Sequence, residues 1–157
     1  SKHAAKIMAS NKKSMDKESY INVASVAGFE GQKGQTVYAA SKGAILGMTL
    51  PMARDLGKFK IRVMTIAPGT SELQWVAIYN KKLPTIIKTT PIGRLGESHE
   101  FALAVKSIVE NPYATGTTWR LDGGVRLPYF DLFMVLMFLN LRSFNFLFNR
   151  LFYVKET

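Results

Sequence analysis

The sequence VYAASKGAILGM, residues 37–48, lies at the start of a segment that predicts a long α-helix between two β-strands. Alanine, leucine, methionine and lysine favour helix, and the predicted helix covers residues 36–56. Gly57 follows directly, at the position where a C′ glycine belongs. Pro51 lies inside the helix, where it removes one backbone hydrogen bond and bends the axis. The segment therefore predicts a helix of about six turns that bends at Pro51.

One side of this predicted helix is built from very small residues. They are Ala39, Ala40, Gly43, Ala44 and Gly47. Each interior glycine costs about 1 kcal/mol in a helix relative to alanine. We therefore expect a neighbouring helix or a cofactor to approach this side closely and offset that cost.

Apolar runs on both sides of the helix predict strands over residues 20–26 and 60–69, and a third follows over residues 116–124. Shorter helices are predicted over residues 3–10 and 96–112. In the second of these, the inward residues are expected to be Phe101, Val105, Ile108 and Val109. Strands that alternate with helices imply right-handed crossovers and a parallel sheet, so the fold class is α/β.

The composition excludes several kinds of chemistry. The 157 residues contain no cysteine, which excludes disulfides, thiolate metal sites and a cysteine nucleophile. His3 and His99 are the two histidines, and neither has neighbours at metal-ligand spacing, so no metal site is expected. The formal net charge is +10, but the basic residues are scattered without a long run or a zinc-finger pattern. We expect no specific nucleic-acid binding, and an anionic cofactor or a CoA-type substrate accounts for part of the charge equally well.

The candidate chemistry lies in Tyr38 and Lys42, which are one helical turn apart and share a face. The bare spacing is weak, because an ordinary exposed pair of residues on a helix has the same pattern. An ammonium group one turn away stabilises a phenolate, and a tyrosine tuned in this way exchanges a proton with a substrate hydroxyl or carbonyl. Ser25 is expected to end the preceding strand, and Pro68-Gly69 ends the next one. Parallel sheets bind ligands at these strand ends.

Residues 127–157 differ in kind from the rest of the chain. They contain no glycine or alanine and are nearly apolar throughout, but Asp131 and Arg142 interrupt the apolar run. A transmembrane helix needs about 20 apolar residues, so a clean span is one of several alternatives. An interfacial helix, a helix that contacts a partner and a non-native extension are the others.

Five segments in sequence order resemble the short-chain dehydrogenase/reductase family. They are Ser25, YAASK with Tyr38 and Lys42, APG at 67–69, PIGRLGESHE at 91–100 and TGTTWRLDGG at 115–124. The resemblance covers residues 1–126 and implies the C-terminal half of a Rossmann-type doubly wound parallel sheet, with three strands and their helices. Residues 127–157 are then an apolar extension. The FEGQ loop and the GMTLP segment resemble a mitochondrial branch that acts on 3-hydroxyacyl-CoA or hydroxysteroid substrates.

The resemblance also implies roles for individual residues. Tyr38 is the expected catalytic acid and base, and Lys42 is expected to lower its pKa and to bond the nicotinamide ribose. Ser25 is expected to orient the substrate oxygen, while Pro68 and Gly69 line the nicotinamide pocket. The expected cofactor is NAD, with NADP as the alternative, and the expected location is the mitochondrion, with the cytoplasm as the alternative.

The sequence departs from the family pattern in ways that affect the cofactor. The TGxxxGxG turn, the acidic selector, the NNAG segment and the catalytic asparagine of the family have no counterpart in these 157 residues. Such a turn holds the pyrophosphate at a helix N-terminus. The isolated chain is therefore expected to be inactive, and a non-catalytic interaction or scaffold subunit is the alternative function. In the family, the helices that match residues 36–56 and 97–111 form subunit contacts, which implies a homo-oligomer.

Overall fold

The computed structural model describes residues 2–10, 18–71, 84, 87–88 and 90–126. Within this range, the residues up to Arg126 belong to one compact unit. The predicted apolar extension, residues 127–157, lies outside the described residues. Among the described residues, no helix combines the length and the apolar character that crossing a bilayer requires.

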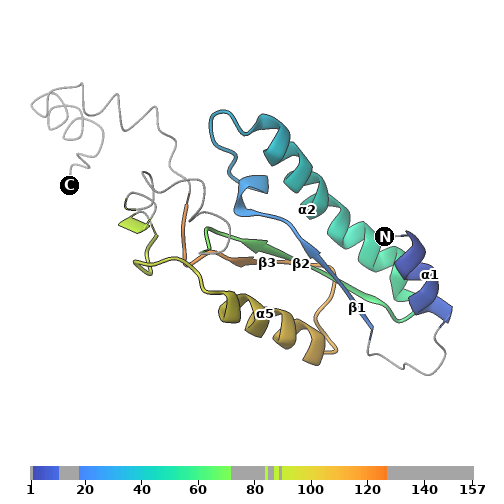
Figure 1. The fold of residues 1–157 in the computed structure, drawn as a ribbon. Helices are drawn as coiled ribbons and strands as arrows, with labels where there is room; N and C mark the ends of the chain where they lie inside the picture. Colours follow the sequence, from blue (N-terminus) through green and yellow to red (C-terminus); the bar gives the residue numbers. More distant parts are fainter. Residues whose placement is uncertain (1, 11–17, 72–83, 85–86, 89, 127–157) are drawn as a thin grey trace, which may run out of the picture. The chain divides into compact units, whose positions relative to one another are not determined.

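Three parallel strands form the sheet, as the alternation of strands and helices predicts (Figure 1). They are β1 (Ser19–Val23), β2 (Arg62–Pro68) and β3 (Thr118–Leu121), and β2 lies in the middle. The register pairs Ser19 with Arg62 at the start of β1. Parallel strands need crossover connections, and helices make both of them here. The fold is therefore the α/β arrangement with three parallel strands that the sequence predicts.

Two long helices cover opposite faces of the sheet (Figure 1). Helix α2 (Thr36–Gly57) connects β1 to β2, and α5 (Ser98–Glu110) precedes β3. A short helix, α1 (Lys2–Ser10), begins the described chain, and a 3₁₀ turn, η1 (Val26–Gly28), lies between β1 and α2. Pro51 lies within α2 as predicted. This arrangement gathers the carboxyl ends of the strands at one edge of the sheet.

The central strand β2 contributes to both layers of the core because its side chains alternate between the two faces. On one face, Met64 and Ile66 pack against Ala104 and Ile108 of α5. On the other face, the buried hydroxyl of Thr65 lies 2.6 Å from that of Thr49 in α2. β2 is buried from Arg62 through Ala67. The continuous apolar run that predicts a buried strand at this point is thus explained by helices on both sides.

The inward face of α5 differs from the prediction at one position. Ala104 and Ile108 are buried and Phe101 and Val105 partly buried, while Val109 is 47% exposed. Val109 lies four residues after Val105, but it falls about 100° away from Ile108, at the edge of the apolar face of the helix. The prediction that Val109 faces inward was therefore wrong, and Ala104 takes that place.

The end of α2 also differs from the prediction. Gly57 is the last residue of the helix, not the residue beyond it, and Lys58 caps it with a right-handed conformation. The left-handed conformation that usually requires glycine occurs at Lys60, with φ of 58°. Three turn hydrogen bonds tighten this connection, including one from the Lys60 amide to the Gly57 carbonyl at 2.9 Å. The chain therefore reverses three residues later than the glycine position predicts.

Candidate active site

Helix α2 places Tyr38 and Lys42 together on its first turns, as their spacing predicts. The Lys42 ammonium lies 5.7 Å from the centre of the Tyr38 ring. It also donates a hydrogen bond of 3.3 Å to the backbone carbonyl of Val23, the last residue of β1. The Tyr38 side chain is 45% exposed, so its ring is accessible from outside. Lys42 thus connects α2 to the carboxyl end of β1.

Ser25 lies two residues beyond the end of β1, so the prediction that it ends the strand was wrong. It caps η1 instead, and its hydroxyl oxygen accepts a hydrogen bond of 3.2 Å from the Ala27 amide. A serine at a helix start offers the backbone this bond in place of further strand pairing. The bond orients the hydroxyl oxygen and leaves its hydrogen able to donate to another group.

The loop after Ser25 packs directly on the small side of α2. A Cβ added at Gly28 would lie 2.9 Å from the Lys42 carbonyl carbon, and one added at Gly31 would lie 2.7 Å from the Ala39 Cβ. Such distances leave no room for a side chain at either glycine. The η1 turn and the loop that follows it therefore approach this side of α2 closely. At Gly47 an added Cβ would meet no other described atom within 4 Å.

Pro68 is the last residue of β2, as the sequence predicts, and Gly69 follows the strand directly. The Ala24 amide donates to the Ile66 carbonyl at 2.8 Å, and the Gly69 amide donates to the Leu121 carbonyl of β3 at 2.9 Å. A cavity of about 550 Å³ opens at this edge. Its apolar lining includes Val23, Pro68, Ile92, Phe101 and Leu121. Lys42 and the cavity are thus connected through Val23.

Charged residues stand at the side of this cavity formed by the start of α5. Arg94 makes two bonds to the Glu100 carboxylate, at 2.6 and 2.8 Å. Glu97 and Glu100 form a reciprocal capping box at the helix start. The Arg94 hydrogen bonds and the Glu97 amide lower the pKa of Glu100 to about 2. The start of α5 is therefore fixed as an ionised cluster next to the cavity.

A second cluster of charged residues, which the sequence did not predict, is formed by Glu30, Arg120 and Asp122. Arg120 bonds the Glu30 carboxylate at 2.7 Å and the Asp122 carboxylate at 2.8 Å. Its guanidinium lies 5.2 Å from the centre of the Phe29 ring. Partial burial opposes its charge, but the carboxylates of Glu30 and Asp122 outweigh this and raise the pKa of Arg120. Glu30 and Arg120 are 90 residues apart, so no local pattern pairs them.

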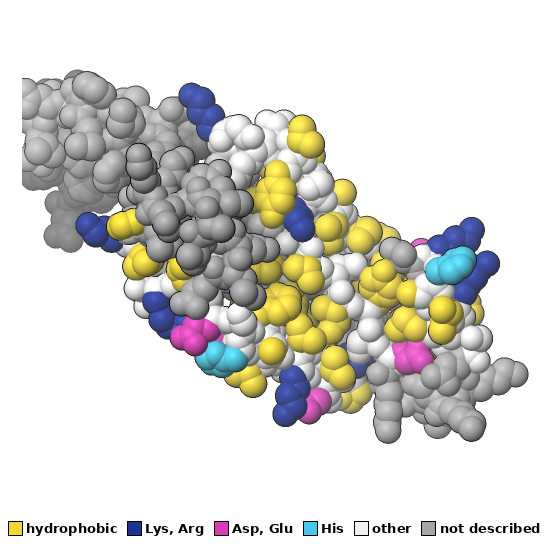
Figure 2. All heavy atoms as spheres, in the orientation of Figure 1, with side chains coloured by type: hydrophobic (Ala, Val, Ile, Leu, Met, Phe, Trp, Pro, Cys, Tyr) yellow, Lys and Arg dark blue, Asp and Glu magenta, His cyan; other side chains and the backbone are white. Residues whose placement is uncertain are grey.

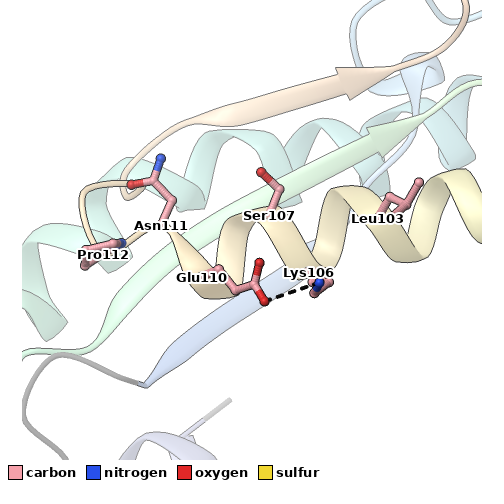
Figure 3. Close-up of a pocket in the computed structure, with 6 residues that line it drawn as sticks. All are labelled: Leu103, Lys106, Ser107, Glu110, Asn111 and Pro112. Carbon is pink, nitrogen blue, oxygen red and sulfur yellow. Dashed lines mark ion pairs between the residues drawn. The ribbon is translucent and has the colours of Figure 1, made fainter.

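A second hollow lies along the outer side of α5, away from the predicted catalytic residues (Figure 3). Lys106 and Glu110 form an ion pair of 3.5 Å within it. Its lining is Leu103, Lys106, Ser107, Glu110, Asn111 and Pro112. The hollow is shallow and open. In the described part of the chain, histidine, aspartate and glutamate form no group that could hold a metal ion.

Comparison with known proteins gives consistent matches. A sequence model of the enoyl-(acyl carrier protein) reductase family matches residues 1–126. The human 3-hydroxyacyl-CoA dehydrogenase type-2 is 50% identical over 109 residues, which cover 68% of this chain and 42% of that protein. The Drosophila melanogaster protein of the same name is 44% identical over 128 residues, 79% of this chain and 50% of the relative.

Comparison with solved structures finds a protein of the same name. The crystal structure of 3-hydroxyacyl-CoA dehydrogenase type-2 from Mycobacterium avium matches with a TM-score of 0.74 and 38% identity. The match covers 81% of this chain and 51% of that structure. The chain therefore spans about half the length of the relatives that it matches.

Proposed function

Since the chain belongs to the short-chain dehydrogenase/reductase family, we propose that it supplies the catalytic groups of an NAD(P)-dependent dehydrogenase. The proposed reaction oxidises the secondary alcohol of a 3-hydroxyacyl-CoA to the ketone, and a hydroxysteroid is the alternative substrate. One observation carries the proposal: Tyr38 and Lys42 lie on one helix face, and Lys42 bonds the strand end that lines the cavity. Membership of an enzyme family favours this function over the scaffold alternative.

The catalytic roles follow from the geometry of three side chains. Tyr38 is accessible and takes the proton of the substrate hydroxyl, which makes it the general base in the oxidative direction. The ammonium group of Lys42 lies 5.7 Å from the centre of the Tyr38 ring, on the same helix face. Ser25 donates its free hydroxyl hydrogen to the substrate oxygen, because the Ala27 amide already fixes the hydroxyl oxygen. Proton removal and substrate orientation are thereby assigned to separate groups.

The edge of the sheet fits a flat nicotinamide ring. The cavity has a largely apolar lining, and Gly69 is among its lining residues. Pro68 and Gly69 would face the ring, and Lys42 and Tyr38 would bond its ribose. A nicotinamide held there would supply the acceptor for the hydride of the carbon that carries the hydroxyl. Within the cofactor class that dehydrogenases of this family use, we propose NAD.

The assembly and location are further parts of the proposal. The outer sides of α2 and α5 expose apolar residues, among them Val37 and Leu103. These residues support a homo-oligomer that forms through both helices. A mitochondrial location is proposed from the similarity to 3-hydroxyacyl-CoA dehydrogenase type-2. Contact of residues 127–157 with a membrane or a partner stays a prediction, because that segment lies outside the described residues.

The test is turnover, which we expect Tyr38→Phe to abolish. The chain is assayed alone and fused behind the N-terminal half of the Drosophila relative, with a 3-hydroxyacyl-CoA and NAD, and NADH formation is followed by absorbance. Removal of the phenol hydroxyl should lower kcat at least about 1,000-fold, because it removes the general base. Lys42→Ala should lower kcat and also weaken cofactor binding.

The matched control is Tyr113→Phe, which removes the hydroxyl of a tyrosine that is 95% exposed and follows α5. This variant should keep normal turnover. Near-normal turnover in Tyr38→Phe would contradict the assigned base. Absence of turnover in the unmodified fusion, with the fold intact, would contradict the proposed substrate class.

A further inference from the structure

We propose that Arg120 is a positioning residue for this site, because it fixes the loop between Ser25 and Tyr38 to the turn that follows β3. This inference depends on the proposed function in one respect, because that function identifies the site that Arg120 would position. Arg120 lies in β3 and contacts neither Tyr38 nor Lys42 by any described bond. Its effect on them is therefore indirect and passes through the loop and the turn.

The first contact of Arg120 is with the loop. Its guanidinium bonds the Glu30 carboxylate at 2.7 Å and lies over the Phe29 ring. Both loop residues follow η1 directly, and the Arg120 and Glu30 side chains are 22% and 26% exposed. Partly buried, charge-assisted bonds of this kind hold their partners more firmly than exposed ion pairs do. Two consecutive loop residues are thus held by one side chain.

The second step leads from the loop to the catalytic helix. Added Cβ atoms at Gly28 and Gly31 would overlap with Lys42 and Ala39, so the loop backbone already touches α2. Such tight contacts transmit a displacement, since close-packed groups cannot absorb it. A shift of the loop at Glu30 therefore changes the position of η1, and with it the position of Ser25 relative to Tyr38.

The third step leads from Arg120 to the end of β2. Asp122 bonds Arg120, and its other carboxylate oxygen accepts from the Gly124 amide at 3.0 Å. A Cβ at Gly69 would lie 2.9 Å from the Asp122 Cα, so this turn packs against the strand end that borders the cavity. The same guanidinium therefore bonds both the loop after Ser25 and the turn that packs against Gly69 at the end of β2.

Arg126 offers a matched control, because it contacts the same two carboxylates in a more exposed position. It lies 3.3 Å from the Asp122 carboxylate and 3.8 Å from that of Glu30, and its side chain is 64% exposed. An exposed ion pair contributes little. Removal of the Arg126 charge changes the net charge as much as removal of the Arg120 charge does, but leaves Arg120 in place between Glu30 and Asp122.

The experiment measures backbone amide hydrogen exchange by NMR on the 157-residue chain and its variants Arg120→Met, Arg120→Lys, Glu30→Gln and Arg126→Met. The amides of Gly28, Phe29 and Glu30 donate to carbonyls within the loop and report its opening. We expect their exchange to become at least about tenfold faster in Arg120→Met and Glu30→Gln. Exchange of the β2 amides should change less than about twofold. Arg120→Lys should restore part of the protection, and Arg126→Met should resemble the unmodified chain.

The Tyr38 ring signals, observed in protein with ¹³C-labelled tyrosine, should move in Arg120→Met and Glu30→Gln but not in Arg126→Met. Equal acceleration of loop and β2 amides would show a general stabilising role and overturn the proposal. Faster loop exchange with unmoved Tyr38 signals would overturn it as well. If Arg120→Met does not fold, the same two measurements on Glu30→Gln test the proposal. The measurement needs neither substrate nor cofactor, so failure of the dehydrogenase proposal leaves its result valid.

Discussion

The carboxylate of Glu100 has two structural tasks, since it accepts from the Glu97 amide and bonds Arg94. Its pKa is lowered from 4.5 to about 2 in the folded chain. Folding therefore favours the ionised form. The stabilisation from this group is fully present above pH 4.5 and is lost as the pH falls through about 2.

The variant Glu100→Gln tests this pH dependence. Glutamine keeps an oxygen that can accept from the Glu97 amide but removes the charge that Arg94 binds. The urea midpoint of the unmodified chain should exceed that of the variant above pH 4.5, and the difference should shrink as the pH approaches 2. Glu110→Gln removes the charge of an exposed ion pair and serves as the control. A difference in midpoint that does not change between these pH values would contradict the prediction.

Lys60 adopts a left-handed conformation that is unfavourable for residues with a Cβ. Lys60→Gly should raise the free energy of unfolding by about 0.5–1 kcal/mol, because glycine adopts this conformation without strain. Lys58→Gly is the control, since Lys58 has a right-handed conformation at the helix end and should lose about the same amount. Chemical denaturation measures both variants. A loss of stability in Lys60→Gly would show that the contacts of the lysine side chain outweigh the strain.

At the residue scale, the sequence predicts the spacing of groups on one element better than contacts between elements. Tyr38 and Lys42 share a helix face because helical geometry fixes their relation. The sequence predicts Ser25 at the end of a strand, but Ser25 lies two residues beyond β1. Its side chain accepts a backbone hydrogen bond and starts η1, which an apolar strand pattern does not indicate. The pairing of Glu30 with Arg120 depends on the whole fold and has no local signal.

At the scale of elements, a pair of buried hydroxyl groups joins α2 to β2. The oxygens of Thr49 and Thr65 are 2.6 Å apart, and Thr49 also donates to the Ile45 carbonyl at 2.9 Å. Thr49 therefore accepts the hydrogen of Thr65. Both residues are almost completely buried. Removal of one hydroxyl leaves its partner without this bond in a dry environment, which is costly.

The variants Thr49→Val and Thr65→Val should each lower the free energy of unfolding by about 1–2 kcal/mol. The double variant should cost less than the sum by about 0.5–1.5 kcal/mol, because no unsatisfied hydroxyl remains. Urea unfolding of the four proteins gives this coupling energy. Additive losses would show that the two hydroxyls do not depend on each other.

The elements themselves were largely predictable, for reasons that differ between them. β2 is a continuous apolar run and α5 has a clear apolar stripe, and both were found close to their observed bounds. The end of α2 could not be predicted in this way. Glycine often follows a helix end, so the sequence predicts Gly57 as the residue beyond the helix, but the turn hydrogen bonds place the chain reversal at Lys60. Helix ends depend on such local bonds, which composition does not specify.

At the scale of the whole molecule, apolar side chains remain on the surface. Figure 2 shows hydrophobic side chains gathered along the middle of the viewed face. On the long helices, the exposed residues include Met48 and Leu50 of α2 and Leu103 of α5. Exposed apolar side chains on both helices support association through these helices. The proposed homo-oligomer through α2 and α5 would cover these helices.

The variants Met48→Glu and Leu103→Glu should therefore reduce self-association. Each places a charge in the proposed contact, where desolvation without a partner is costly. Sedimentation velocity of the 157-residue chain should show a shift towards the monomer in both variants. Ile7→Glu in α1 is the control, because Ile7 is exposed but lies outside the proposed contact. An equal shift in the control would show general association of apolar surface and contradict the specific contact.

The bond between Glu30 and Arg120 also has a consequence for the order of events on the ribosome. Synthesis proceeds from the N-terminus at about 5–20 residues per second, so Arg120 follows Glu30 after a delay on the order of ten seconds. During that delay the nascent chain already contains Ser25, Tyr38 and Lys42, but not the side chain that fixes their loop. A chaperone that binds the emerging polypeptide would therefore meet the proposed catalytic residues before they have reached their final arrangement.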